Sequence, residues 1–213
     1  MGARDDWYRK TSWSVADAAE FEQRLGKSRG QKAQYIKLQA WHLAETGKAR
    51  LAAPAIALAM RYLEEDPGGF HEVEAHLIVA EANVTLGNTT AALEAYRAAV
   101  EAESRSRGAK CCAYLAYAWF AVTNNLTKEF DDVLKSMDSM EDGDLVFPLS
   151  QYKFFASLAL ISSEQGDRTN ARRMAQNALE AEARAAPFAR HKNVGVVKDI
   201  DPSVRKRIRQ LAA

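Results

Sequence analysis

The stretch from His76 to Glu103 reads HLIVAEANVTLGNTTAALEAYRAAVEAE and determines the fold class. Apolar and small side chains recur on both sides of Gly87 at the spacing of one helical face. Glycine between two such segments can take the left-handed conformation that ends a helix. The stretch therefore predicts a helix, a tight turn at Gly87 and a second helix.

The same arrangement recurs along the chain. Gly47 and Gly166 stand at equivalent points of two further copies, and Asn125 marks a fourth, degenerate copy. Successive turn residues are 40, 38 and 41 residues apart. The copies at Gly87 and Gly166 also have small residues where their two helices would cross, as in Ala80 against Ala92 and Ala159 against Ala171, and small side chains let the backbones approach closely. These observations predict a repeated helix-turn-helix unit.

This pattern resembles the tetratricopeptide repeat superfamily over residues 31 to about 184. The resemblance implies an all-α fold, specifically a right-handed α-solenoid of about four helix-turn-helix units with N- and C-terminal capping helices. Two features depart from the family: the spacings exceed its repeat of about 34 residues, and the proline that usually ends a unit appears only as Pro67. The opening run WYRKTSWS, residues 7–14, resembles the start of a group of uncharacterised bacterial proteins of this type.

The flanks of the array have the features of caps. Ser14 can cap a helix that runs to Leu25, with Gly26 just after it, and Asp201 can start a last, basic helix. We therefore expect an N-terminal arm and capping helix in residues 1–30, the repeat array in 31–184, and a C-terminal tail with a basic capping helix in 185–213.

In the tetratricopeptide superfamily the first helix of each pair lines an inner groove. Transferring those groove positions and their neighbours to this sequence gives Gln34, Lys37, Trp41, Leu77, Glu81, Leu115, Trp119, Lys153 and Leu160. Aromatic rings provide contact area at a low entropic cost, which favours anchoring of a peptide there. The alternative is that Trp41 and Trp119 only fill the core between units, and both interpretations stay open.

Charge is distributed unevenly along the chain. Residues 62–104 carry nine acidic side chains against one basic side chain, whereas residues 184–213 carry eight basic against two acidic ones. We expect the first stretch to present an acidic face that includes Glu72, Glu74 and Glu81. Such a face favours a basic protein partner, and self-association of the chain is the alternative.

The composition excludes several classes of protein and partner. Of the 213 residues, 47% are hydrophobic and 27% are charged, and the formal net charge is +1. These values are typical of a packed globular protein without a strong affinity for nucleic acid or membranes. The two adjacent cysteines, Cys111 and Cys112, predict free thiols and a cytoplasmic location. No apolar segment approaches the roughly 20 residues that span a bilayer.

The sequence contains no recognisable catalytic or metal-binding motif. The segment HEVEAH, residues 71–76, places its histidines five positions apart, whereas a zinc-binding HExxH helix needs them one position closer. The two cysteines lack a second, spaced pair. We therefore expect no cofactor, no metal ion and no enzymatic activity.

The sequence thus predicts a non-enzymatic protein-protein interaction module, a scaffold or adaptor that binds a partner protein or peptide in its concave groove in a bacterial cytoplasm. Two alternatives stay open. One is a regulator that binds a small molecule or short signalling peptide in the groove, and the other is an enzyme whose site no motif reveals. A closed pocket with several convergent polar groups would favour either alternative.

Overall fold

The structure is a computed structural model that describes residues 6–105, 110–140, 143–188 and 190–213. These residues form ten α-helices and one short 3₁₀ helix, and they contain no β-strand. The all-α class is therefore confirmed. The elements are α1 (Val15–Lys27), α2 (Lys32–Glu45), α3 (Ala49–Glu65), α4 (Glu72–Thr85), α5 (Thr89–Arg105), α6 (Ala113–Thr123), η1 (Thr127–Glu129), α7 (Phe130–Met137), α8 (Pro148–Glu164), α9 (Arg168–Glu182) and α10 (Pro202–Ala212).

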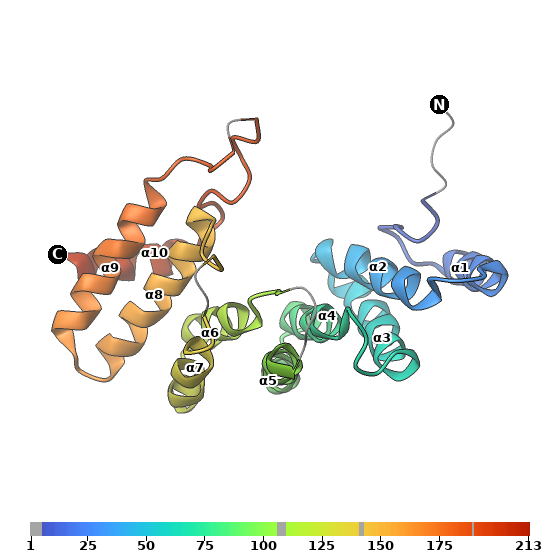
Figure 1. The fold of residues 1–213 in the computed structure, drawn as a ribbon, viewed down its shortest axis with the longest axis horizontal. Coiled ribbons are helices and arrows are strands. Elements are labelled where there is room, and N and C mark those ends of the chain that lie inside the picture. The colour runs from blue at the N-terminus through green and yellow to red at the C-terminus, as the bar shows by residue number, and fades with distance from the viewer. Residues whose placement is uncertain (1–5, 106–109, 141–142, 189) are drawn as a thin grey trace. The chain divides into compact units, whose positions relative to one another are not determined.

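The chain divides into two compact units, residues 1–113 and 114–213, which we call the N-terminal unit and the C-terminal unit and describe separately. In the N-terminal unit α2 packs on α3, α3 on α4 and α4 on α5, and α2 also contacts α4. In the C-terminal unit α8 packs on α9, and α10 packs against both (Figure 1). Within the described residues, no helix has the length and apolar character needed to cross a membrane.

All four predicted turns are confirmed. Gly47, Gly87 and Gly166 have φ values of 62°, 73° and 81°, and Asn125 has a φ of 53°. A helix ends just before each of these residues, and the next helical element begins shortly after it. At Gly87 the N–H of the following residue, Asn88, donates to the carbonyl of Asn83 at 2.9 Å. This hydrogen bond closes the last turn of α4 in the manner of a left-handed helix cap.

The predicted small residues lie where helices pack. Ala80 of α4 and Ala92 and Ala99 of α5 are fully buried, and so are Ala159 of α8 and Ala178 of α9. Buried alanines let paired helices approach closely, because no long side chain separates the two backbones. The helix pairs α4–α5 and α8–α9 are consequently built on the same small-residue contacts.

The N-terminal arm is bound to the first two helices through Lys10 and Gln39. The backbone N–H of Lys10 donates to Gln39 Oε1 at 3.0 Å, and Gln39 Nε2 donates to the Lys10 carbonyl at 2.8 Å. The ammonium of Lys10 lies 2.8 Å from Asp17 and 2.5 Å from Glu20, both on α1. Gln39 is fully buried, so these two hydrogen bonds satisfy an amide that would otherwise be costly to bury.

Aromatic packing completes the attachment of the arm. Trp7 packs on Phe21 of α1 and Tyr35 of α2 with ring centroids 5.3 and 5.2 Å apart, and Trp13 packs on Phe21 at 5.5 Å. Ser14 caps α1 as predicted, since its Oγ accepts from the Asp17 N–H at 3.1 Å. The run WYRKTSWS therefore has a structural role in covering the first helices.

One predicted boundary is wrong. Helix α1 ends at Lys27 and not at Leu25, so Gly26 lies inside the helix. The Ser28 N–H donates to the Leu25 carbonyl at 3.1 Å, and Ser28 itself is extended. Because this bond satisfies a terminal carbonyl directly, the helix ends without a left-handed glycine.

The C-terminal segment returns to α8 before α10 begins. The Leu149 N–H, in the first turn of α8, donates to the Gly195 carbonyl at 2.8 Å. Gly195 has a φ of 69°, and a Cβ atom there would lie 2.1 Å from the ring of Phe147. Helix α10 then starts at Pro202 with Asp201 as its cap, as predicted, and buries Ile208.

We expect Gly195→Ala to lower the free energy of unfolding by roughly 1–3 kcal/mol, because alanine is strained at this φ and its methyl group would displace Phe147. Gly26→Ala is the matched control. No atom lies near the new methyl group at that helical position, and alanine should stabilise the helix by up to about 1 kcal/mol. Urea unfolding followed by circular dichroism measures both changes. Equal stability of the two variants would contradict the described contact of Gly195 with Phe147.

Candidate functional site

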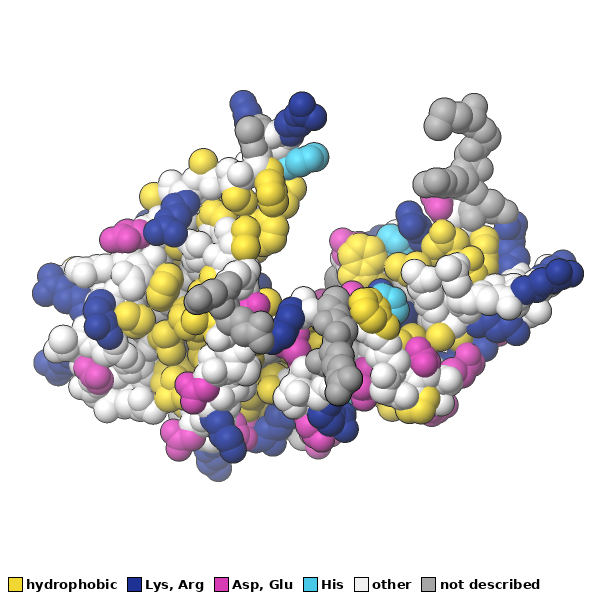
Figure 2. Space-filling view, viewed as in Figure 1, with side chains coloured by type: hydrophobic (Ala, Val, Ile, Leu, Met, Phe, Trp, Pro, Cys, Tyr) yellow, Lys and Arg dark blue, Asp and Glu magenta, His cyan; other side chains and the backbone are white. Residues whose placement is uncertain are grey.

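Two large aromatic side chains lie exposed on the N-terminal unit. Trp41 of α2 is 43% exposed, and Phe70, in the loop before α4, is 63% exposed. We call these two residues the aromatic patch. Figure 2 shows hydrophobic side chains beside histidine side chains on the visible face of this unit. Side chains of this size are usually buried, so their exposure singles out this surface.

An ion-paired network connects the helices that carry the patch. Lys37 lies one helical turn before Trp41 on α2, and its ammonium is 2.5 Å from Glu74 Oε2 of α4. The same oxygen is 2.7 Å from His71 Nδ1, and His71 directly follows Phe70. Lys37 is only 8% exposed. The network therefore ties Trp41 and Phe70 to a common base formed by α2 and the start of α4.

The ionisation of Glu74 is set by two opposing effects. Burial disfavours its charged form, but the close ammonium of Lys37, together with the neighbouring His71, outweighs burial and holds the pKa of Glu74 below its ordinary value. Glu74 is therefore charged at neutral pH. Lys37 and Glu74, both predicted as partner-binding residues, are occupied with each other inside the unit.

The loop that presents Phe70 is ordered by Tyr62 of α3. The buried Tyr62 hydroxyl donates to Asp66 Oδ2 at 3.0 Å and accepts from the His71 N–H at 3.1 Å. Burial is the main reason that the pKa of Tyr62 rises to about 12. The ring of Phe70 meets His71 edge-on with centroids 5.0 Å apart. Phe70 is thus exposed on a loop whose backbone is fixed at both ends.

Trp41 is supported from its own helix. Its ring meets that of His42 at 4.7 Å in an edge-on arrangement. Burial lowers the pKa of His42, so this imidazole is neutral at neutral pH. Glu45, one turn after Trp41 on α2, is exposed. An indole with a neutral neighbour and a carboxylate one turn away can accept apolar or cationic side chains of a partner.

The other predicted residues of the N-terminal unit have different environments. Gln34 and Glu81 are exposed, while Leu77 is half-buried against the cluster formed by Val73, Ala99, Ala102 and Ala113. Glu72 lies 3.5 Å from the guanidinium of Arg105. Of the predicted acidic face, Glu72 and Glu74 are therefore paired with cations of their own unit.

In the C-terminal unit the structure brings Trp119 and Lys153 together. The Lys153 ammonium lies 5.7 Å from the centre of the Trp119 ring, and Tyr152 meets the same ring at 6.2 Å. Trp119 is partly exposed, whereas Leu115 and Leu160 are buried. Trp119 and Lys153 belong to the C-terminal unit, whereas Lys37 and Trp41 belong to the N-terminal unit.

The cysteines have the properties of structural side chains. The thiols of Cys111 and Cys112 are not joined in a disulfide bond, and both side chains are partly buried. Burial, together with the nearby carboxylates of Glu74 and Glu103, raises the pKa of Cys111 to about 11, which keeps this thiol protonated and unreactive. Glu103 also accepts from the Cys111 and Ala113 N–H groups at 2.5 and 2.8 Å and so caps α6. The described residues contain no cluster of three or more metal-ligating side chains.

Phe70 and His71 are the site residues that the sequence reasoning missed. The repeat pattern placed groove residues on the first helix of each pair, whereas Phe70 lies in the loop between two pairs. A usable signal is the aromatic residue directly after Gly68 and Gly69, because a large apolar side chain in a glycine-containing loop has little core to enter.

Comparison of this chain with protein-family models, curated proteins and solved structures gave no match.

We expect the contribution of Glu74 to stability to depend on pH. Because its pKa is lowered in the folded state, its stabilisation is complete above the unfolded value of about 4.3 and is lost as the pH falls through the lower, folded value. Glu74→Gln should lower the unfolding free energy by on the order of 1 kcal/mol at pH 7. The difference from the unmodified chain should shrink below about pH 4.

Urea unfolding at a series of pH values measures this difference. The exposed Glu94 of α5 offers a control, Glu94→Gln, which should behave like the unmodified chain throughout. A Glu74→Gln effect that stays constant down to the lowest pH would show that the Lys37–Glu74–His71 network does not form.

Proposed function

We propose that this chain is a non-enzymatic protein-interaction module of the tetratricopeptide type, a scaffold or adaptor that binds a partner segment. In this proposal the helix pairs stack as a right-handed α-solenoid whose first helices line the binding surface. Support comes from the turns at Gly47, Gly87, Asn125 and Gly166, each of which separates two helical segments. The contact of α2 with α4, the first helices of two successive pairs, also supports it.

The single observation that carries the proposal is the aromatic patch on its ion-paired base. Trp41 and Phe70 are exposed, yet the backbone beneath them is fixed by Lys37, Glu74 and His71. Rigid aromatic side chains that protrude from an ordered surface are typical of the residues that dominate binding energy at protein interfaces. Binding of a partner at these two rings would require little loss of conformational entropy, because the backbone beneath them is already ordered.

The chemistry of the patch defines the partner segment. Lys37 and Glu74 neutralise each other, so the base of the patch offers no free charge to a ligand. The partner must therefore bind Trp41 and Phe70 through apolar or aromatic side chains. Glu45, exposed beside Trp41 on α2, favours a basic residue next to these anchors. The partner is thus an apolar segment flanked by Lys or Arg.

Selection from a random peptide library on the immobilised chain tests this function. Selected peptides should carry apolar anchors next to basic residues. Their affinity should fall about tenfold or more for Trp41→Ala and for Phe70→Ala, since removal of a central aromatic anchor costs roughly 2 kcal/mol. Met60→Ala is the matched control, because Met60 of α3 is 44% exposed in the same unit but lies outside the patch. It should leave the affinity unchanged.

Fluorescence anisotropy with labelled peptides gives the affinities, and thermal unfolding of each variant confirms that it is folded. Peptides that bind the two patch variants and Met60→Ala equally well would contradict the proposal. Selection of acidic peptides without apolar residues would contradict it as well.

A further inference from the structure

A second candidate surface lies on α9 of the C-terminal unit. It consists of three exposed cationic side chains that line one groove, which we call the basic strip: Arg168, Arg172 and Arg173. Gln176, which lines the same groove, donates from Nε2 to the Ala212 carbonyl of α10 at 3.3 Å. Figure 2 shows Lys and Arg side chains over α9 on the visible face.

Most of these charges are not used within the unit. Among the described residues, no ion pair involves Arg168 or Arg172 of the strip or Lys206 of α10, and all three are exposed. Arg209, also on α10, lies 3.8 Å from Glu182 and keeps 63% of its side chain exposed. By contrast, Arg205 pairs with Glu182 at 2.6 Å and Arg207 pairs with Glu164. These last two arginines therefore hold α10 in place.

The position of the cations on α9 is not explained by helix stability. Arg168 occupies the first turn, and Arg172 lies one turn later, while the first turn contains no acidic residue apart from the cap Asp167. Cations near the N-terminus of a helix are repelled by its dipole. A feature that opposes local stability is expected at a functional surface. The unfavourable placement of Arg168 and Arg172 near the start of α9 therefore favours a role for them in binding an anionic group.

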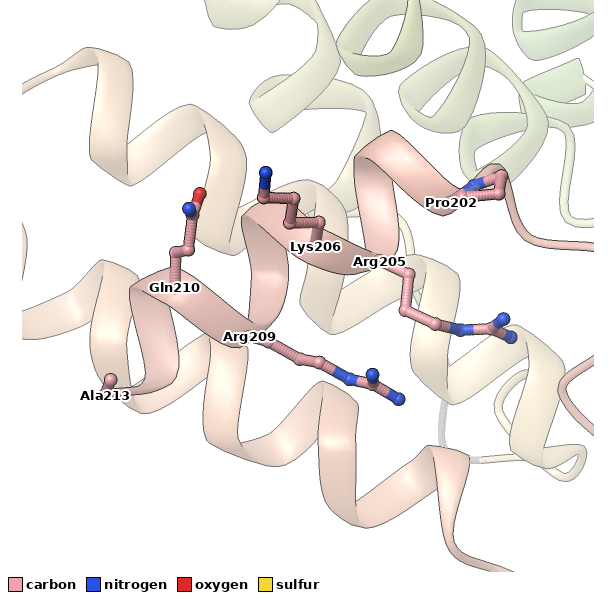
Figure 3. Close-up of a pocket in the computed structure, with 6 residues that line it drawn as sticks. All are labelled: Pro202, Arg205, Lys206, Arg209, Gln210 and Ala213. Atoms are coloured by element: carbon pink, nitrogen blue, oxygen red, sulfur yellow. The ribbon is translucent and has the colours of Figure 1, made fainter.

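The neighbouring helix α10 carries further cationic side chains, which line a separate groove. Figure 3 shows Arg205 and Arg209 on one side of the helix, and Lys206 and Gln210 on another. Neither the residues that line the groove on α9 nor those that line the groove on α10 include an aromatic ring on which a nucleic-acid base would stack.

We propose that the basic strip binds an acidic segment of a partner protein, with carboxylates of Asp or Glu bound by the guanidinium groups of α9. Arginine presents a planar donor pair that matches a carboxylate, so Arg168 and Arg172, one turn apart, can each take one acidic side chain. Glu180 and Glu182 lie farther along α9 and would repel carboxylates there, so the acidic segment of the partner should end before them. This surface is independent of the aromatic patch, and it does not rest on the function proposed for that patch.

A fluorescent peptide of alternating Glu and Ser is the probe for the full chain, and its Gln and Ser counterpart is the uncharged control. The variant is Arg168→Glu with Arg172→Glu and Arg173→Glu. The control variant, with the same change in net charge, is Lys128→Glu with Lys135→Glu and Lys192→Glu, three exposed residues of the same unit. Glutamates near the start of α9 suit its dipole, so the first variant should unfold at the same temperature as the unmodified chain or higher.

We expect the acidic peptide to bind about tenfold or more weakly to the α9 variant, and the control variant to bind within about twofold of the unmodified chain. Binding should also weaken from about 0.1 M to about 1 M salt, as the Debye length falls from roughly 10 Å to about 3 Å. Equal losses for both variants would mean that only net charge matters, which overturns the proposal. The proposal would also be overturned if single-stranded RNA or anionic lipid vesicles bound more tightly than the peptide and this binding was lost in the α9 variant. Absence of peptide binding to the unmodified chain would overturn it as well.

Discussion

Close approach of helix backbones at buried alanines is the constraint on which the structure depends. Ala80, Ala92 and Ala99 lie fully buried between α4 and α5, and a bulkier side chain would hold the two helices apart. An alanine buries little apolar area, so no single contact of this kind contributes much stability. Larger buried side chains must therefore supply most of the stabilisation from apolar burial. Tyr62 is one of them, and its hydroxyl also orders the loop that leads to α4.

The same close packing determines which polar groups must be paired. The contact of α2 with α4 places Lys37, whose side chain is 10% exposed, opposite Glu74, whose side chain is 38% exposed, and the ammonium alone would be costly to bury. Pairing removes that cost, and it also removes both charges from the surface available to a partner. What stays exposed is aromatic, namely Trp41 and Phe70. The binding chemistry of this surface therefore follows from the helix packing beneath it.

Local features could be predicted from the sequence, and contacts between distant residues could not. The turns at Gly47, Gly87 and Gly166 follow from the preference of glycine for positive φ, and the caps at Ser14 and Asp201 follow from side chains next to their helices. Nothing local to Lys37 indicates Glu74 as its partner, because 37 positions separate them. The bonds between Lys10 and Gln39 are hidden for the same reason.

The distribution of charge illustrates how pairing changes an interpretation made from residue counts. Counting along the chain places the basic character in residues 184–213, yet Arg205 and Arg207 are neutralised by Glu182 and Glu164. Arg168 and Arg172, which such a count omits, have no ion pair among the described residues. A surface field depends on the charges left after pairing. Subtracting the ion pairs therefore lowers the basic character of α10 and adds α9 to the basic surface, although the net charge of +1 is unchanged.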